Sequence, residues 1–336
     1  MTKTLSSLLL PYRSASIIGM SKNAGKTTAL NQIIREISLC GKTLGLTSIG
    51  RDGEDQDLVT GTKKPGIYIP ENTLIATASE LVLRSCDITR EILHTTGIHT
   101  PMGEVVLLRA KSDGNVQLAG PSMTGQLAKI REDFLRFGAD MVLFDGALSR
   151  KTLCSRHVSQ ATVLCTGASY HRNMQTVVED TAYQCRILSL PETGDAEIRL
   201  LAQRGSRWVV LMTADGPKIL PDGEKIEEAL RKIPARAVFF GGALTDLTLK
   251  PLLMSSLQLQ GLQIVVRDSS KILLKQENFE KLQRRGIRLQ VVEDVNLVAV
   301  TVNPFSAYGN HFDPAALMAA MEQRVDIPVI NVMEEA

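Results

Sequence analysis

One segment near the N-terminus constrains the fold more than any other part of the sequence. The apolar run SASIIG (Ser14–Gly19) predicts a short buried strand, and the loop after it ends in the residues GKTT. From Lys26 onward, apolar residues recur at three- and four-residue steps, which predicts an amphipathic helix that ends at Gly41. A strand that leads through a glycine-containing loop directly into a helix is typical of α/β folds with a parallel sheet.

The rest of the chain repeats this alternation of apolar runs and helical segments over 336 residues. We predict an α/β fold: a doubly wound, mostly parallel sheet, followed by a second α/β half. The segment PETGD at 191–195 is the expected linker. It separates a first domain over residues 1–190 from residues 196–336, which form either a second α/β domain or a continuation of the same sheet. Residues 51–70 are predicted to be a long loop, and residues 79–93 a helix.

Composition excludes several classes of function. Lys and Arg total 38 against 36 Asp and Glu, so the formal net charge is only +2, and no basic block or row of aromatic residues indicates nucleic-acid binding. No stretch has the length and hydropathy of a membrane span or a secretory signal. We therefore expect a cytoplasmic protein that binds neither nucleic acid nor membrane.

The residues GMSKNAGKTT predict a phosphate-binding loop, the P-loop. Small residues let main-chain N–H groups surround the phosphates, the lysine adds a positive charge, and the helix N-terminus adds its dipole. Asn303 follows a late apolar strand and is a candidate for reading the nucleotide base. The predicted nucleotide-binding residues are Gly19, Ser21, Lys22, Asn23, Ala24, Gly25, Lys26, Thr27, Thr28 and Asn303.

Carboxylates downstream predict a Mg²⁺ site. Asp145 ends the apolar strand in MVLFDGA, where it can hold a Mg²⁺-bound water beside the phosphates. The acidic loop after the second strand offers Asp52 first and Asp55 next, in the position of a switch segment. The predicted metal residues are Thr27, Asp52, Asp55 and Asp145, and the predicted catalytic residues are Lys26, Asp52 and Asp145.

The loop departs from the usual P-loop spacing, because Met20 stands where the first glycine is usual and Gly19 lies one position earlier. In this it resembles dethiobiotin synthetase and its relatives in the SIMIBI (signal-recognition, MinD and BioD) class of P-loop proteins, over roughly residues 14–190. Dimeric members of that class carry a signature lysine at the position of Ser21. Here Lys22 comes one residue late, which does not favour a lysine acting across a dimer. The oligomeric state, a homodimer included, stays open.

A closer resemblance rests on GMSKNAGKTTALN, TSIGRDGEDQDLVTGTKKPGIYIPENTLIATASE, LFDGALSRK and VTVNPFSAYGNHFDP. Together these segments resemble the KamB family, the reactivase subunits associated with lysine 5,6-aminomutase. The resemblance implies an ATP-hydrolysing accessory factor that reactivates an adenosylcobalamin-dependent aminomutase. Its implied protein partners are the aminomutase and a second ATPase subunit similar to MutS.

Two alternatives stay open beside this interpretation. One is a small-molecule kinase or ligase resembling dethiobiotin synthetase, favoured by the shifted glycine of the loop. The other is a non-catalytic nucleotide-binding adaptor in cofactor biosynthesis. The expected ligands are ATP and Mg²⁺, and the residues do not distinguish ATP from GTP; lack of an intact Mg²⁺ site would favour the adaptor.

Overall fold

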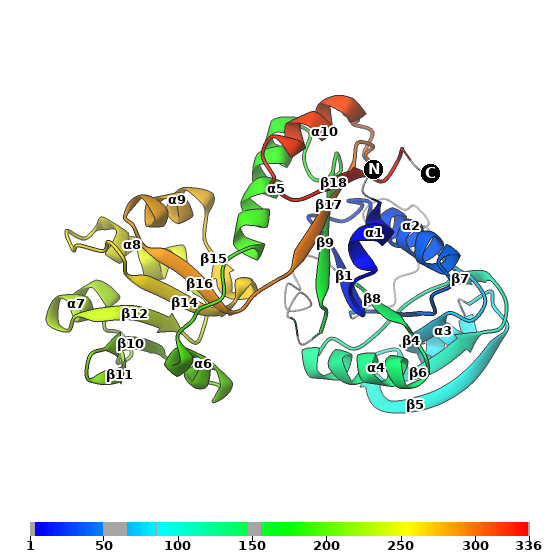
Figure 1. Ribbon diagram of the computed structural model, residues 1–336, viewed down its shortest axis with the longest axis horizontal. Coiled ribbons are helices and arrows are strands. Elements are labelled where there is room, and N and C mark those ends of the chain that lie inside the picture. The colour runs from blue at the N-terminus through cyan, green and yellow to red at the C-terminus, as the bar shows by residue number, and fades with distance from the viewer. Residues whose placement is uncertain (1–3, 50–65, 85, 147–155, 157, 335–336) are drawn as a thin grey trace. The chain divides into compact units, whose positions relative to one another are not determined.

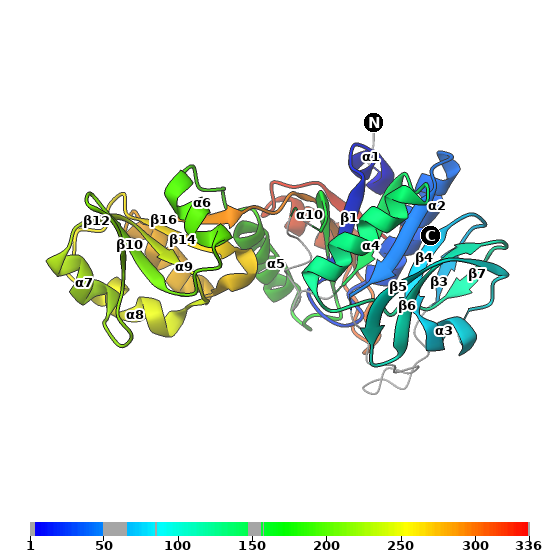
Figure 2. The same cartoon turned by 90° about the horizontal axis from the view of Figure 1, so that it is seen from below.

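The computed structural model describes residues 4–49, 66–84, 86–146, 156 and 158–334. The chain divides into two compact units, whose elements are labelled in Figure 1 and, from a second direction, in Figure 2. Unit 1 comprises Met1–Cys185 together with Asn296–Ala336, and unit 2 comprises Arg186–Val295. Within the described ranges, no helix combines the length and the apolar character needed to cross a bilayer.

Unit 1 is built on a large, mostly parallel sheet with the strand order β18-β17-β9-β1-β8-β2-β4-β6-β5. The strands from β18 to β4 run parallel to their neighbours, and β6 is antiparallel to both β4 and β5. A small antiparallel pair, β3 and β7, lies outside this sheet. The strands are β1 (Ser14–Gly19), β2 (Leu44–Ser48), β3 (Ile67–Ile69), β4 (Leu74–Ala78), β5 (Arg90–Thr100), β6 (Gly103–Ala110), β7 (Gly114–Val116), β8 (Met141–Asp145), β9 (Ala161–Gly167), β17 (Leu297–Asn303) and β18 (Val329–Asn331).

Helices cover both faces of this sheet. The helices of unit 1 are α1 (Leu5–Leu9), α2 (Lys26–Leu39), α3 (Ser79–Arg84), α4 (Thr124–Arg136), α5 (Met174–Leu188, which runs on into unit 2) and α10 (Pro314–Glu322). One apolar core joins α1 and α2 to one face of β1, β8 and β2, and a second joins α4 to the opposite face. The expected α/β architecture with helices on both faces of a mostly parallel sheet is therefore confirmed for unit 1.

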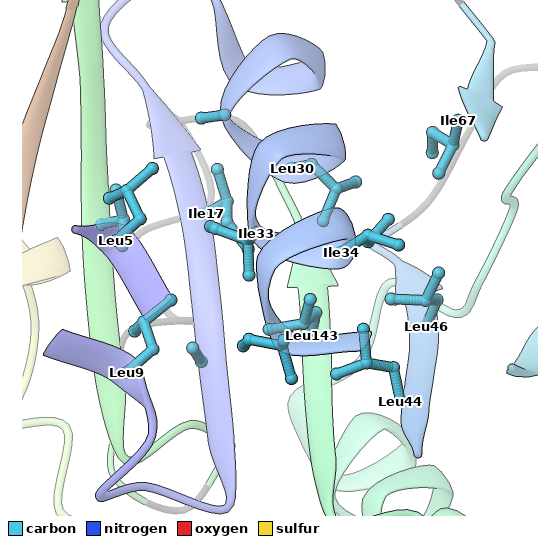
Figure 3. Close-up of a cluster of buried hydrophobic side chains, with 14 of the residues drawn as sticks. Leu5, Leu9, Ile17, Leu30, Ile33, Ile34, Leu44, Leu46, Ile67 and Leu143 are labelled. Carbon is cyan, nitrogen blue, oxygen red and sulfur yellow. The ribbon is translucent and has the colours of Figure 1, made fainter. Parts of the chain in front are cut away.

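Helix α2 forms because its apolar residues line one side. Leu30, Ile33, Ile34 and Ile37 are all buried against the sheet, and Figure 3 shows Ile33 beside Ile17 of β1. Gly41 has a φ of 71°, so it takes the left-handed conformation with which helices commonly end. Burying four aliphatic side chains of this size stabilises the helix on the sheet by about 6–12 kcal/mol before entropy is counted.

Unit 2 has its own sheet, with the order β11-β10-β12-β14-β16, in which β12, β14 and β16 are parallel and β10 is antiparallel to its neighbours. Its core joins α6 to β10, β12 and β14. The elements are α6 (Ala196–Gln203), β10 (Val209–Thr213), β11 (Gly216–Ile219), α7 (Ile226–Lys232), β12 (Ala235–Phe240), β13 (Leu244–Thr245), α8 (Asp246–Met254), β14 (Gln263–Asp268), η2 (Ser269–Lys271), β15 (Ile272–Leu273), α9 (Gln276–Arg284) and β16 (Arg288–Glu293).

The domain division differs from the predicted one in its second boundary. The first boundary lies close to the expected linker, but residues 196–336 form neither one separate domain nor one continuation of the sheet. Unit 2 ends at Val295. After it, β17 returns to pair with β9 of the first sheet, and β18 pairs with β17 at the sheet's edge. The apolar pattern of a strand does not reveal which sheet it joins, so the pairing of β17 with the first sheet could not be predicted from the sequence.

The predicted helix over 79–93 is wrong beyond its first part. Helix α3 ends at Arg84, and β5 begins at Arg90 and pairs antiparallel with β6. Residues 90–100 include β-branched Ile92, Thr95 and Ile98, which suit a pleated surface better than a helix. The predicted long loop over 51–70 is also interrupted by β3, while its residues up to 65 lie outside the described ranges.

Candidate functional site

The carboxyl ends of neighbouring parallel strands bring the predicted site residues together. Gly19 ends β1, Asp145 ends β8 and Asn303 ends β17. In the sheet, Ile17 lies opposite Asp145, and Asn303 lies opposite Gly167 at the end of β9. Parallel sheets bind ligands at this edge, because the loops that follow the strands meet there.

The loop Met20–Gly25, called the glycine loop below, has the backbone shape that a phosphate cradle requires. Asn23 and Gly25 take positive φ angles of 59° and 88°, so the chain turns twice in the left-handed region before α2 begins. Ala24 is buried, with 1% of its surface exposed. Successive main-chain N–H groups in such a turn point toward a common concavity, which suits an anion.

Lys26 opens α2 and folds back over the glycine loop. Its Nζ donates a hydrogen bond of 3.3 Å to the carbonyl oxygen of Ser21. A Cβ placed on Gly19 would lie 2.8 Å from Cγ and 3.1 Å from Nζ of Lys26. The absence of a side chain at Gly19 therefore lets the lysine lie across the loop, with its positive charge above the Ser21 carbonyl oxygen.

Asn303 lies directly against the glycine loop, although β17 is far from that loop in the sequence. A Cβ on Gly25 would lie 3.0 Å from the Cβ of Asn303 and 3.4 Å from its Nδ2. The Oδ1 of Asn303 accepts a hydrogen bond of 2.9 Å from the N–H of Phe305, which fixes the side chain. Gly167 closes the other side, since a Cβ there would overlap the Asn303 carbonyl group. Glycine is needed at both positions for this close approach.

The Cys165 thiol is buried in β9 beside the start of the glycine loop. Cys165 lies opposite Gly19 in the sheet, and its carbonyl oxygen accepts a hydrogen bond of 2.8 Å from the N–H of Met20. Burial raises the pKa of Cys165 to about 11. The hydroxyl of Thr301 and the Lys26 ammonium group work against that rise, while the Asp145 carboxylate adds to it.

Thr27 and Thr28 lie in the first turn of α2, and both are partly exposed. Thr28 also lines a largely apolar groove of about 620 Å³ that follows α2. Its other residues come from α2, from β3 and the residue after it, and from the residue after β18; they are Asn31, Gln32, Ile34, Arg35, Ser38, Leu39, Tyr68, Pro70 and Val332. The groove therefore begins in the first turn of α2 and is lined by neither Lys26 nor Asp145.

The structure brings together most of the predicted site residues. Gly19 to Thr28, Asp145 and Asn303 share one edge of the sheet, with Lys22 exposed at the surface of the loop. Asp52 and Asp55 lie outside the described residues, so their predicted metal role stays a prediction. Among the residues that the structure describes, His, Cys, Asp and Glu form no group of three able to hold a metal ion.

The segment after Asn303 holds none of the predicted site residues, although VTVNPFSAYGNHFDP carries part of the resemblance to the KamB family. Tyr308 lies beside the glycine loop, where its hydroxyl accepts a hydrogen bond of 3.4 Å from Nδ2 of Asn23. Phe305 and His311 in the same segment form an edge-to-face pair with ring centroids 5.5 Å apart. A further signal in the sequence is the density of aromatic residues in NPFSAYGNHF, in a chain where they make up 4% of all residues.

A scan against models of protein families gave no match for the chain, and a search of curated proteins gave no significant match. The function is therefore inferred from the residues of the site.

Proposed function

We propose that this chain is a P-loop protein that binds a nucleoside triphosphate, with ATP as the expected ligand, at Gly19–Thr28 and hydrolyses it. The observation that carries the proposal is the position of Lys26, whose Nζ lies over the glycine loop at 3.3 Å from the Ser21 carbonyl oxygen. A lysine held there at the start of a helix supplies charge to the terminal phosphates, and the helix dipole adds to it.

The residues present fit a triphosphate. Positive φ at Asn23 and Gly25 turns main-chain N–H groups toward one concavity, and Gly19 leaves room for the lysine side chain. At the other end of the loop, Asn303 keeps its Nδ2 close to Gly25, where it can donate to a ring nitrogen or exocyclic oxygen of a base. Phosphates and base would thus occupy opposite ends of the glycine loop.

The residues near the loop also fit Mg²⁺. This ion keeps several waters and binds through one or two carboxylates and the substrate's phosphates, so a compact cluster of protein ligands is not required. The Thr27 hydroxyl and the Asp145 carboxylate are the described groups that would hold it, together with the predicted Asp52. Bound there, the ion would neutralise charge on the phosphates.

Calorimetric titration of ATP with Mg²⁺ into the Lys26→Ala variant tests the proposal. Loss of a charged hydrogen-bond donor to phosphate should weaken the affinity for ATP about 10- to 100-fold. Lys42→Ala is the matched control, because Lys42 lies just after α2 and pairs with Asp140 at 3.7 Å on the surface. Wild-type affinity in Lys26→Ala would remove the basis of the assignment.

Unit 2 supports a protein partner as the target of the nucleotide cycle. Leu247 and Met254 lie seven residues apart on α8, with 84% and 76% of their surface exposed. Leu273 of β15, with 59% exposed, lies opposite Thr245, the residue that caps the start of α8. Large apolar side chains exposed together commonly mark interaction sites. We propose that unit 2 contacts a protein and that nucleotide hydrolysis in unit 1 drives a change in that complex.

By its resemblance to KamB-family reactivases, the proposed partner is an adenosylcobalamin-dependent aminomutase together with a MutS-like ATPase subunit. The test is co-purification of such an enzyme with the full chain in the presence of ATP and Mg²⁺. Leu247→Asp should abolish the association, whereas Leu83→Asp on α3, equally exposed but in unit 1, should not. Co-purification that depends neither on ATP nor on Leu247 would contradict this partner role.

The groove along α2 bears on the alternative of a small-molecule kinase. A phosphoryl acceptor has to reach the terminal phosphate, which the Lys26 ammonium group would hold. The groove starts at Thr28 and follows α2 away from that lysine, and Asp145 does not line it. Its position therefore favours the switch over transfer to a bound metabolite.

A further inference from the structure

The segment Pro304–Phe312, called the aromatic loop below, is a closed hairpin rather than an open connection. The N–H of Phe312 donates to the carbonyl oxygen of Pro304 at 2.9 Å, and Ser306 N–H donates to Asn310 at 3.1 Å. Asn310 Nδ2 in turn donates to the carbonyl oxygen of Ala168 at 2.8 Å, just after β9. The loop is thus attached to the strand ends on both sides.

This fixed loop exposes aromatic rings. Phe305 and Tyr308 have 44% and 46% of their surface exposed, although each could pack inward in a hairpin that served only to connect two elements. The Phe305 ring meets His311 at an interplanar angle of 62°, and this single edge-to-face contact leaves much of the Phe305 ring exposed. Holding large aromatic faces toward water in a rigid loop has no benefit for folding, which points to a ligand.

Two contacts join the aromatic loop and the residue before it to the glycine loop, one of them made by the Tyr308 ring's hydroxyl. The Tyr308 hydroxyl lies 3.4 Å from Nδ2 of Asn23, and Asn303, the residue before the aromatic loop, packs on Gly25. The aromatic loop therefore borders the glycine loop at two of its residues, on the side of the sheet edge where β17 ends. A nucleotide whose phosphates lie in the glycine loop has to extend its base past one of its borders.

We propose that Phe305 and Tyr308 form a stacking platform for the nucleobase of the bound triphosphate. The proposal rests on the function proposed above and adds the residues that bind the base. Purine rings stack on tyrosine and phenylalanine faces without a hydrogen-bond code, while Asn303 donates to an edge of the same base. The platform makes binding depend on the base as well as on the phosphates.

The test compares ATP with inorganic tripolyphosphate, which has the phosphates but no base, in the presence of Mg²⁺. Tyr308→Ala and Phe305→Ala should each weaken ATP affinity about 5- to 30-fold and leave tripolyphosphate affinity within about twofold. Tyr308→Phe keeps the ring and loses the hydroxyl contact with Asn23, so it should retain most of the ATP affinity. Ile92→Ala, an exposed apolar residue on the edge strand β5, is the control and should change neither affinity.

The outcomes separate this inference from the proposed function. Equal weakening of both ligands by Tyr308→Ala would mean that Tyr308 only supports the glycine loop through Asn23, and would overturn the platform. Unchanged ATP affinity in both alanine variants would overturn it as well. If the wild-type chain bound neither ligand, the triphosphate site itself would fail and the platform with it. If it bound both ligands equally tightly and no variant mattered, the platform alone would fail.

Discussion

Asn303 and Gly25 touch across the edge of the sheet: a Cβ on Gly25 would lie 3.0 Å from the Cβ of Asn303. The contact joins the end of β17, which follows unit 2 in the chain, to the start of α2. Any side chain added at Gly25 must displace Asn303, so the shape of the glycine loop and the position of the predicted base-reading residue depend on each other.

Gly25→Ala should therefore reduce both stability and ATP affinity. The φ of 88° costs a non-glycine residue about 1–2 kcal/mol, and the added methyl group presses on Asn303. Chemical denaturation and calorimetric titration measure the two effects. Gly41→Ala is the matched control, with a φ of 71° but no atom within 4 Å of the added Cβ. Gly41→Ala should lose a similar backbone contribution to stability and keep its ATP affinity. Equal ATP affinity in Gly25→Ala and Gly41→Ala would contradict the role of the Asn303 contact.

Gly19→Ala should separate binding from folding. The added Cβ would lie 2.8 Å from Cγ and 2.9 Å from Cδ of Lys26, so this flexible side chain has to move off the glycine loop. Because a lysine can turn into solvent at small cost, we expect thermal stability to change little while ATP affinity falls toward that of Lys26→Ala. The double variant Gly19→Ala/Lys26→Ala should bind no more weakly than Lys26→Ala alone. Additive losses would show that Gly19 acts independently of the lysine.

The local part of the site could be predicted from the sequence. The observed bounds of β1 agree with the predicted ones, and α2 begins at Lys26 as expected. Both are marked by an apolar run or stripe that is short in sequence. Helix α10 also begins at a local signal, the Asp313 cap, whose side chain accepts a hydrogen bond of 2.8 Å from the N–H of Ala316. Short-range packing and capping decide these elements, so the pattern is sufficient.

Contacts between distant segments could not be predicted. Nothing in the apolar run Leu297–Asn303 says that it pairs with β9 instead of with a strand of unit 2. Asn303 could be proposed as a base reader only from its place after a strand, and Tyr308 offered no signal of its contact with Asn23. The error at β5 has a related cause, since the predicted helix ran on to residue 93, while Arg90–Thr100 is a strand that pairs with the distant β6.

Asp145→Asn should remove Mg²⁺-dependent hydrolysis while preserving the fold. The substitution keeps the shape of the side chain but removes the charge that would attract a Mg²⁺-bound water at the end of β8. Phosphate release and thermal unfolding are the two measurements. Asp140→Asn, at the opposite end of the same strand, removes a surface carboxylate that pairs with Lys42 and should leave hydrolysis unchanged. Normal turnover by Asp145→Asn would exclude Asp145 as the metal residue.

The buried thiol beneath the site predicts a loss of stability in alkaline solution. Burial raises the pKa of Cys165 from the usual 9.0 to about 11, so between these pH values the unfolded chain releases the proton and the native chain keeps it. Because the native state then binds more protons, the free energy of unfolding falls as pH rises, by up to about 1.4 kcal/mol per pH unit for this thiol. Stability from this group is fully present below pH 9 and declines toward pH 11.

Urea denaturation from pH 8 to 11 under reducing conditions measures the dependence of the free energy of unfolding on pH. Cys185, with its pKa raised to about 12, also contributes to this slope. Cys165→Ala should make the slope shallower, whereas Cys40→Ala, which removes an exposed thiol, should not. An unchanged slope in Cys165→Ala would mean that the thiol beneath the glycine loop is accessible to water, and hence that the packing of β9, β17 and α2 around it is looser than described.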